Sequence, residues 1–469
     1  MAEGQFPLVD VLKNGLCIGC GACFAFDKRV AVVWNDQGFL EANFLEAKFG
    51  EEVEKNHAIF LELCRKVCPF SGNAANEDEL GNEFFSSKCS RHSAELGWFI
   101  KTYVGAVVDP TLRRQSSSGG IGRWLLQKLI SGTYVDACAH VIPGAVVGDD
   151  NLFCYHVSHD AGELTHSAQS AYYPVTLKSV LELIEQEPGR YAVTALPCFV
   201  KAIRLLQLQS ETFRERIPYV IGLFCGHLKS RFYAEMLAWQ MNVPGTVKAV
   251  TFRDKSRAIK ANEKGFVVWT AEDNKQHGPR TISDLFGASY NLGLFQHKAC
   301  DYCDDVVAEL ADVSIGDAWL PEYISDPLGT SLVVVRDPLF IDMLEEGRAR
   351  GELWIEPISP LKVVESQSGG FRHRREGLAY RLYLNESSGI WYPPKRIRPS
   401  AAIPRLRRKI YLMRLLLREE SFNAFRKAKM SGEFEVFRAK MQPLINRYIS
   451  LYRPSLLERI LRKLRSIFF

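Results

Sequence analysis

Three cysteines near the start of the chain, Cys17, Cys20 and Cys23, constrain this sequence more than any other feature. Their C-x2-C-x2-C spacing lets one tight loop aim three thiolates at a single cluster, and Gly19 and Gly21 allow the backbone to close around it. Zinc is the alternative ligand, but zinc sites usually pair two separate C-x2-C motifs. The triple run therefore favours a [4Fe–4S] cluster.

The fourth ligand of this cluster must come from elsewhere in the chain. In bacterial ferredoxins it is a cysteine followed by proline. Here Cys68 precedes Pro69, and Cys64 lies one helical turn before it. We expect Cys68 to be the fourth ligand and keep Cys64 as the other candidate. Residues 1–75 are thus predicted to form a small ferredoxin-like iron–sulfur module.

The rest of the N-terminal region contains three predicted segments. Two apolar runs, Val30–Trp34 and Phe39–Ala42, flank a polar turn and predict a β-hairpin. A helix-like stretch follows from Glu46 to Val67. The polar segment from Asn73 to Lys88 is predicted to be a linker.

Alternating strand-like and helix-like segments predict an α/β (α+β) body with a mixed sheet. Predicted strands lie at Phe99–Val108, Val135–Ile142, Tyr191–Leu196, Tyr219–Phe224 and Ser331–Arg336. Predicted helices lie at Ile121–Ile130, Leu177–Gln186, Phe199–Gln207 and Phe340–Glu346. We divide this body into residues 95–175 and 176–385, and place a basic helical tail at 391–469.

Two further cysteines follow predicted strands of this body. The strand–helix–strand unit from Tyr191 to Phe224 should have parallel strands, so Cys198 and Cys225 should emerge at the same sheet edge. Cys300 and Cys303 form a C-x2-C pair farther along. Four cysteines from three loops could hold a second [4Fe–4S] cluster. The alternative for Cys198 and Cys225 is that they are small buried apolar residues.

A Ser- and Gly-rich loop precedes the predicted helix that begins at Ile121. Ser117, Ser118, Gly119 and Gly120 offer hydroxyls and free backbone N–H groups beside the positive end of the helix dipole, which suits a phosphate group. The same residues could equally form an ordinary helix cap with a flexible loop.

The composition indicates where such a chain works. The hydrophobic and charged fractions, 47% and 24%, are those of a globular protein. The first residues lack the apolar stretch of a secretion signal, and no apolar run approaches the roughly 18 residues needed to span a membrane. Twelve cysteines in clusters indicate metal ligation in a reducing compartment rather than disulfides. We therefore expect a cytoplasmic protein.

The tail at 391–469 carries 20 Lys and Arg but only 5 Asp and Glu. One basic cluster comprises Arg405, Arg407, Arg408 and Lys409, and a second comprises Arg459, Arg462, Lys463 and Arg465. Basic, leucine-rich helices of this kind suit peripheral contact with an anionic membrane, here the inner face. A helical hairpin packed on the body, or a docking face for an acidic partner, are the alternatives. No nucleic acid is expected, because the tail has no recognisable binding motif.

These motifs occur in the same order as in a known family. The chain resembles the beta subunit of the hydrogenase and dehydrogenases that use coenzyme F420, and is similar to bacterial and plant relatives that include 7-hydroxymethyl chlorophyll a reductase and proteins of polysaccharide gene clusters. The resemblance covers roughly residues 10–380. It rests on the three clustered cysteines, Ser-Ser-Gly-Gly, Cys198 after Leu-Pro, Cys225 after Leu-Phe, and the Cys300/Cys303 pair with Ala311-Asp312 and Gly316-Asp317 after it. It implies two [4Fe–4S] clusters and FAD inside an α/β body.

The family's functional residues carry over onto particular positions. Ser117, Ser118, Gly119 and Gly120 match its Ser-Gly-Gly loop, which the resemblance implicates in flavin binding. Ser170 and Tyr172 match a Gly-Ser-Lys-Tyr element, although Gln169 and Ala171 stand where Gly and Lys would be. The absent Lys removes a phosphate or hydride-acceptor contact. The family's cluster ligands match Cys198, Cys225, Cys300 and Cys303.

We therefore expect an oxidoreductase that passes electrons from ferredoxin or a similar one-electron donor through the clusters to FAD and an organic substrate. Polysaccharide or lipid-linked sugar metabolism is the suggested context. The alternative is an electron-relay beta subunit that links a partner enzyme to a deazaflavin or flavin carrier; a third reading makes the clusters structural ties only. Tyr172, His227 and Asp317 are the candidate catalytic residues, and each could equally be structural.

Overall fold

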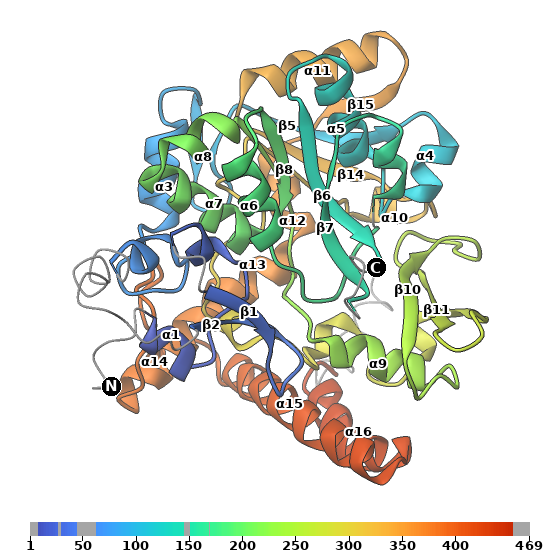
Figure 1. Cartoon of the computed structure of the whole chain (residues 1–469). Helices are drawn as coiled ribbons and strands as arrows, with labels where there is room; N and C mark the ends of the chain where they lie inside the picture. Colours follow the sequence, from blue (N-terminus) through green and yellow to red (C-terminus); the bar gives the residue numbers. More distant parts are fainter. Residues whose placement is uncertain (1–7, 27–29, 45–61, 145–150, 168, 454–469) are drawn as a thin grey trace, which may run out of the picture.

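A computed structural model describes residues 8–26, 30–44, 62–144, 151–167 and 169–453. An eight-stranded mixed sheet forms its centre, with the strand order β15-β5-β14-β13-β9-β8-β6-β7 (Figure 1). The strands are β5 (Lys101–Val107), β6 (Ala137–Pro143), β7 (Phe153–Ser158), β8 (Tyr191–Ala195), β9 (Tyr219–Leu223), β13 (Val313–Asp317), β14 (Ser331–Val335) and β15 (Leu353–Pro357). The predicted α/β body with a mixed sheet is confirmed.

The four central strands β6, β8, β9 and β13 run parallel to one another. Val193 pairs with Val220 between β8 and β9, and Val313 pairs with Ile221 between β13 and β9. The strand–helix–strand unit was therefore predicted correctly, and its strands end at the same edge of the sheet. Ligands of open α/β sheets bind beyond this carboxyl edge.

Helices cover both faces of the sheet, and neighbouring strand residues alternate between them. Helices α5 (Ile121–Ser131) and α11 (Pro338–Ala349) share a core with Ile221 and Ala192. Helices α6 (Lys178–Gln186), α7 (Pro197–Gln209) and α8 (Glu211–Arg216) share a core with Val193 and Val220 on the opposite face. These layers are seen in Figure 1.

The N-terminal region packs directly onto this second face. It contains α1 (Val9–Lys13) and the predicted hairpin, β1 (Val30–Trp34) with β2 (Leu40–Phe44). Leu16 and Ile18 belong to the same core cluster as Leu181 on α6, and the N–H of Leu177 donates to the carbonyl of Cys20 at 3.0 Å. Most of the predicted helix from Glu46 to Val67 lies outside the described residues.

The predicted linker at 73–88 is wrong. Helix α3 (Glu77–Phe85) occupies it, and its start is fixed by a capping box in which Asn76 and Glu79 satisfy each other's backbone N–H groups. Leu80 and Phe85 are fully buried, so the segment is part of the core. The polar composition that suggested a linker is that of an amphipathic helix with an acidic first turn.

A second layer lies beside the sheet. It comprises α9 (Arg231–Trp239), the three-stranded sheet β10 (Val247–Asp254), β11 (Gly265–Thr270) and β12 (Gln276–Thr281), and the hairpin α15 (Arg405–Ser431) with α16 (Phe434–Ser450). Figure 1 shows this hairpin in red at the bottom of the view. Phe425 and Phe437 from the hairpin pack with Phe232 and Phe295 in one aromatic core.

The smaller elements connect these layers. They are β3 (Arg91–Ser93), β4 (Gly97–Phe99), α4 (Pro110–Gln115), α10 (Pro321–Ile324), α12 (Pro360–Ser366), α13 (Ser368–Arg374) and α14 (Glu376–Ser387).

The first basic part of the tail is a packed hairpin, which was one of the predicted alternatives. Arg407 pairs with Glu376 at 2.8 Å, and Arg408 donates to the carbonyls of Ala401 and Ile403. The second basic cluster, Arg459 to Arg465, lies outside the described residues. Within the described ranges, no helix has the length and apolar character required to cross a membrane.

Candidate functional site

The first cysteine set gathers beside the hairpin. Gly19 and Gly21 have φ values of 64° and 85°, and a Cβ on Gly19 would lie 2.5 Å from the Leu40 carbonyl, so the loop needs glycine there. Burial raises the pKa of the Cys23 thiol well above its usual value, and the charges of neighbouring cysteines raise it further. Such thiols stay protonated unless a metal stabilises the thiolate.

Both candidates for the fourth ligand lie at this first set. The thiol of Cys68 is influenced by Cys20 and Cys17, whereas the strongest thiol neighbour of Cys23 is Cys64. Cys64 is fully buried, and its Sγ lies 3.9 Å from the Cys23 carbonyl. The choice of Cys68 therefore stays a prediction.

The second cysteine set surrounds one cavity. Cys198 follows β8, Cys225 follows β9, and Cys300 and Cys303 lie on and directly after a 3-10 turn at Lys298–Tyr302. All four line the same cavity, and the N–H of Leu228 donates to Cys300 Sγ at 3.2 Å. Backbone N–H groups aimed at sulfur are typical of iron–sulfur sites.

The donor set fits a cluster better than a single ion. Among the described residues, no three His, Cys, Asp or Glu side chains converge closely enough to hold one metal ion. The four thiols of the second set are instead spread around a cavity, and a [4Fe–4S] cluster takes one thiolate at each of four separate iron atoms.

The two cysteine sets adjoin each other. Ile18, from the loop of the first set, and Phe70, two residues after Cys68, line the cavity of the second set. The charge of Cys20 also acts on the Cys198 thiol. His297 lies three residues before Cys300, and its ring hydrogen bonds to the Cys17 carbonyl at 3.0 Å. One packed region therefore carries both sets.

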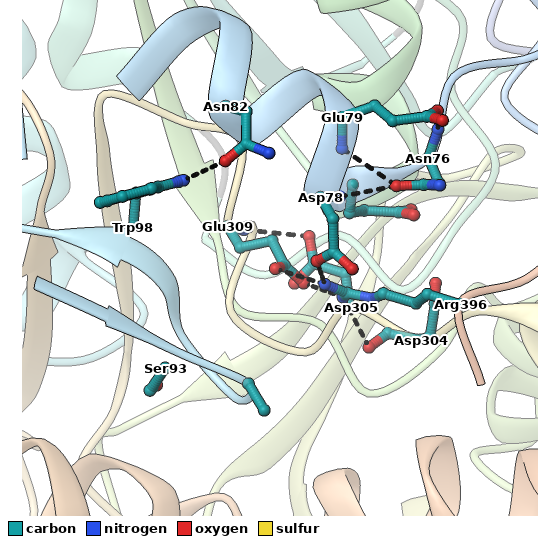
Figure 2. Close-up of polar contacts among 12 residues, drawn as sticks. Asn76, Asp78, Glu79, Asn82, Ser93, Trp98, Asp304, Asp305, Glu309 and Arg396 are labelled. Carbon is teal, nitrogen blue, oxygen red and sulfur yellow. Dashed lines mark hydrogen bonds and ion pairs between the residues drawn. The ribbon is translucent and has the colours of Figure 1, made fainter. Parts of the chain in front are cut away.

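A buried ionic network fixes the loop that follows Cys303, as Figure 2 shows. Arg396 donates to Asp304 at 3.3 Å and to Asp78 and Glu309 at 2.8 Å each. Asp304 and Glu309 are 1% and 2% exposed, so these carboxylates depend on the guanidinium for solvation. The network joins α3, the Cys303 loop and the segment after α14.

A second polar centre, around Arg253, lies near the carboxyl end of β13. Arg253 forms a bidentate ion pair with Asp317 at 2.8 and 2.9 Å, and also donates to the Tyr172 hydroxyl and the Ser117 carbonyl. Burial raises the pKa of Asp317, but Arg253 outweighs this effect and holds it below its usual value. Ser170 and Ser117 have their hydroxyl oxygens 3.2 Å apart.

Aromatic rings connect this polar centre to the second cysteine set. Tyr172 packs against Tyr290 with 5.2 Å between ring centroids, and Tyr290 stacks on His227 at 3.9 Å. His227 lies two residues after Cys225. The Tyr290 hydroxyl donates to the His227 carbonyl and accepts from the His227 backbone N–H. Burial lowers the pKa of His227 well below its usual value, so the ring is neutral.

The structure thus brings Tyr172, His227 and Asp317 into one continuous row. The Ser-Gly-Gly loop lies at the end of this row but uses its residues for packing. A Cβ on Gly119 would lie 2.8 Å from the Gly105 carbonyl, and Ser118 Oγ donates to the Thr330 carbonyl. Within the loop, Ser117 is the residue whose hydroxyl faces Ser170.

Sequence reasoning missed three residues of this site, Arg253, Tyr290 and Arg374. Arg253 lies near the end of β10, a strand that also carries Lys248 and Asp254, so a charged residue there gives no clear signal. Tyr290 lies in a 3-10 turn and Arg374 at the end of α13, and no spacing in the sequence connects either to the cysteines.

Comparisons with known proteins identify a family. The N-terminal profile of the coenzyme F420 hydrogenase/dehydrogenase beta subunit matches residues 102–182, and its C-terminal profile matches 189–360. Together they cover more than half of the chain.

Two known proteins are similar to the chain, one in sequence and one in structure. A coenzyme F420-dependent sulfite reductase from Methanocaldococcus jannaschii is 20% identical in an alignment of 435 residues that covers 84% of this chain and 59% of the relative. A chain of the F420-reducing [NiFe] hydrogenase complex from Methanosarcina barkeri aligns with a TM-score of 0.47 and 17% identity, over 66% of this chain and 100% of that one. On the strength of the two profile matches, the chain belongs to the coenzyme F420 hydrogenase/dehydrogenase beta subunit family, a family of oxidoreductase components.

Proposed function

We propose that the chain is an electron-transferring oxidoreductase with a [4Fe–4S] cluster at each cysteine set and FAD beyond the carboxyl edge of the sheet. The clusters would supply single-electron storage, and the flavin would supply exchange between one- and two-electron chemistry. A ferredoxin-like donor and an organic substrate, in polysaccharide or lipid-linked sugar metabolism, are the proposed partners.

One observation carries this proposal: the cavity lined by Cys198, Cys225, Cys300 and Cys303 adjoins the first cysteine set on one side and the aromatic row on the other. A purely structural metal site needs no such continuity. The neutral His227 is buried and the half-buried Tyr290 ring stacks on it, so these rings limit water between the cysteines and the Arg253 centre, which favours electron transfer in a medium of low polarity.

The residues at the sheet edge fit a flavin. Leu223 ends the central strand β9 yet is 39% exposed, so an apolar surface is available where α/β proteins place their ligands. The hydroxyls of Ser117 and Ser170 face each other and can donate to a phosphate. Tyr172 and Arg253 would orient the bound group, with Asp317 holding the guanidinium in place.

In the alternative, the chain is an electron-relay subunit: the site is the same, but a partner enzyme carries out the reaction on the substrate. The Methanocaldococcus relative is named a coenzyme F420-dependent sulfite reductase, and this chain spans 59% of its length. A chain that covers part of such an enzyme suits a subunit or domain that exchanges electrons with a deazaflavin carrier. Gln169 and Ala171, where the family carries Gly and Lys, favour a substrate other than the deazaflavin.

Cofactor content and turnover of the anaerobically purified chain test the proposal. We expect iron, acid-labile sulfide and stoichiometric flavin, and substrate reduction with reduced viologen as the only donor. The double variant Ser117→Ala/Ser170→Ala should lose flavin and keep iron. Turnover that requires a second protein would support the relay, and a protein without flavin would overturn the proposed reductase. Gly119 is a poor target, because any side chain there collides with Gly105.

A further inference from the structure

A buried arginine that no motif predicted faces the second cysteine set. Arg374, the last residue of α13, lines the cavity formed by the four cysteines and is 1% exposed. Its Nη1 donates to the carbonyl of Cys225, and its Nη2 donates to the carbonyl of Gly226 at 2.8 Å. The guanidinium therefore fixes the backbone of Cys225, a proposed cluster ligand, through hydrogen bonds.

The Nε donor of this guanidinium has no protein acceptor: it is buried and has no hydrogen-bond partner among the described residues. The carboxylate of Asp305 acts on Arg374, but no carboxylate of the described residues forms an ion pair with it, although Arg381 and Arg418 nearby in the fold both contact Asp301. A buried charge without a direct partner is costly, so a negative group in the cavity would stabilise it.

Carboxylates act on both cysteine sets: Glu41 on Cys17, and Asp305 on Cys225 and Cys303. Ala42, next to Glu41, donates its N–H to Cys17 Sγ at 3.3 Å. The second set also has the guanidinium of Arg374, which lines its cavity and acts on Cys225, Cys300 and Cys303. A negative neighbour disfavours the addition of an electron, whereas a positive neighbour favours it.

We infer that Arg374 is a positioning residue for the Cys198–Cys303 site: it holds Cys225 in place and supplies a positive charge in the cavity that raises the reduction potential of this site. A higher potential here favours the passage of electrons from the first set to the second set and on to the aromatic row. This inference rests on the proposed function, because it needs a cluster at each cysteine set.

The test is a redox titration of the whole anaerobic protein followed by electron paramagnetic resonance, with iron measured on every sample. Two waves are expected in the unmodified protein; Cys300→Ser should alter the wave of the second set and Cys17→Ser the wave of the first set. Arg374→Met should move only the second-set wave to more negative potential, by at least tenfold in the reduction equilibrium, which is about 59 mV for one electron. Arg374→Lys keeps the charge and should restore most of this shift.

Arg336 provides the matched control. It is fully buried, its Nε likewise has no partner among the described residues, and its guanidinium binds the Ala311 and Leu96 carbonyls. Arg336→Met should leave both potentials unchanged.

The outcomes separate the two claims. If the unmodified protein holds only one cluster, the proposed function fails. If both clusters are present and the second-set wave does not move in an iron-replete Arg374→Met protein, the inference is wrong and the proposed function stands. If Arg374→Met does not fold, Arg374→Gln, which removes the charge but keeps a hydrogen-bond donor, decides by the same criterion.

Discussion

The imidazole of His227 lies flat against the ring of Tyr290, with 3.9 Å between ring centroids and 18° between their planes. This stacked pair joins two parts of the site that the sequence keeps far apart. His227 follows Cys225 by two residues, and Tyr290 reaches Tyr172 and, through it, Arg253. The geometry of the pair therefore controls how closely the polar centre approaches the second cysteine set.

Replacement of Tyr290 by Phe tests this pair. The variant keeps the ring but loses both hydrogen bonds to the His227 backbone, which should cost about 1–3 kcal/mol because a buried N–H and carbonyl lose their partner. Thermal unfolding under argon measures the loss. We also expect slower reduction of the flavin by a one-electron donor in stopped-flow traces, with iron content unchanged. A variant with native stability and rate would show that the pair is passive.

Replacement of Arg396 by Met should destabilise the Cys303 loop. It leaves Asp304 and Glu309 buried with fewer partners, and the breaking of a buried ion pair costs about 3–5 kcal/mol. Denaturant unfolding measures this, and iron content should fall toward half. Arg438→Met is the control, because its pair with Glu435 is exposed and is worth no more than about 1 kcal/mol. Equal effects of the two substitutions would contradict the role given to the network.

The same network predicts a pH dependence. Burial raises the pKa of Glu309 to about 7 from 4.5, even though Arg396 beside it pulls the value down. Because the folded pKa is the higher one, this group stabilises the fold fully below pH 4.5, and the contribution is lost as pH rises through about 7. The melting temperature should therefore fall more between pH 6 and pH 8 in the unmodified protein than in Glu309→Gln. Parallel curves would mean that Glu309 is already ionised at pH 6.

The sequence predicted the elements that depend on local patterns. Apolar runs located β5, β8, β9 and β14, and the parallel β8–α7–β9 unit correctly placed Cys198 and Cys225 at one edge. Helix α3 was missed because its many polar residues suggested a linker. Two signals pointed to a helix: the capping box of Asn76 and Glu79, and the apolar Leu80 and Phe85, which are buried.

Other features could not be predicted because they depend on packing between distant segments. Arg374 and Cys225 are 149 residues apart, and Arg253 and Asp317 are 64 apart. The three-stranded sheet around β10 was missed; both of its strand pairings contain register shifts. The basic tail looked like a separate segment, but Phe425 and Phe437 complete the core around Phe295.

Truncation of the tail separates packing from membrane contact. Removal of all residues after Trp391 exposes the aromatic core and should give an aggregating chain. Removal after Arg453 keeps the hairpin and deletes Arg459, Arg462, Lys463 and Arg465. If this second basic cluster binds anionic lipid, the full chain should co-sediment with phosphatidylserine-containing vesicles at low salt but not high salt, and the shorter chain should not. A full chain that stays in the supernatant at low salt rules out membrane binding.

The central claim, that each of the two cysteine sets holds a cluster, is tested most directly by the iron and acid-labile sulfide content of the anaerobically purified chain. The account predicts about eight iron and about eight sulfide per chain, as expected for two [4Fe–4S] clusters. Cys300→Ser and Cys68→Ser should each disturb one cluster and leave the other, while Cys138→Ser, a buried thiol bonded to the Leu126 carbonyl, should leave both. Stoichiometric zinc without sulfide, or about four iron per chain, would contradict it.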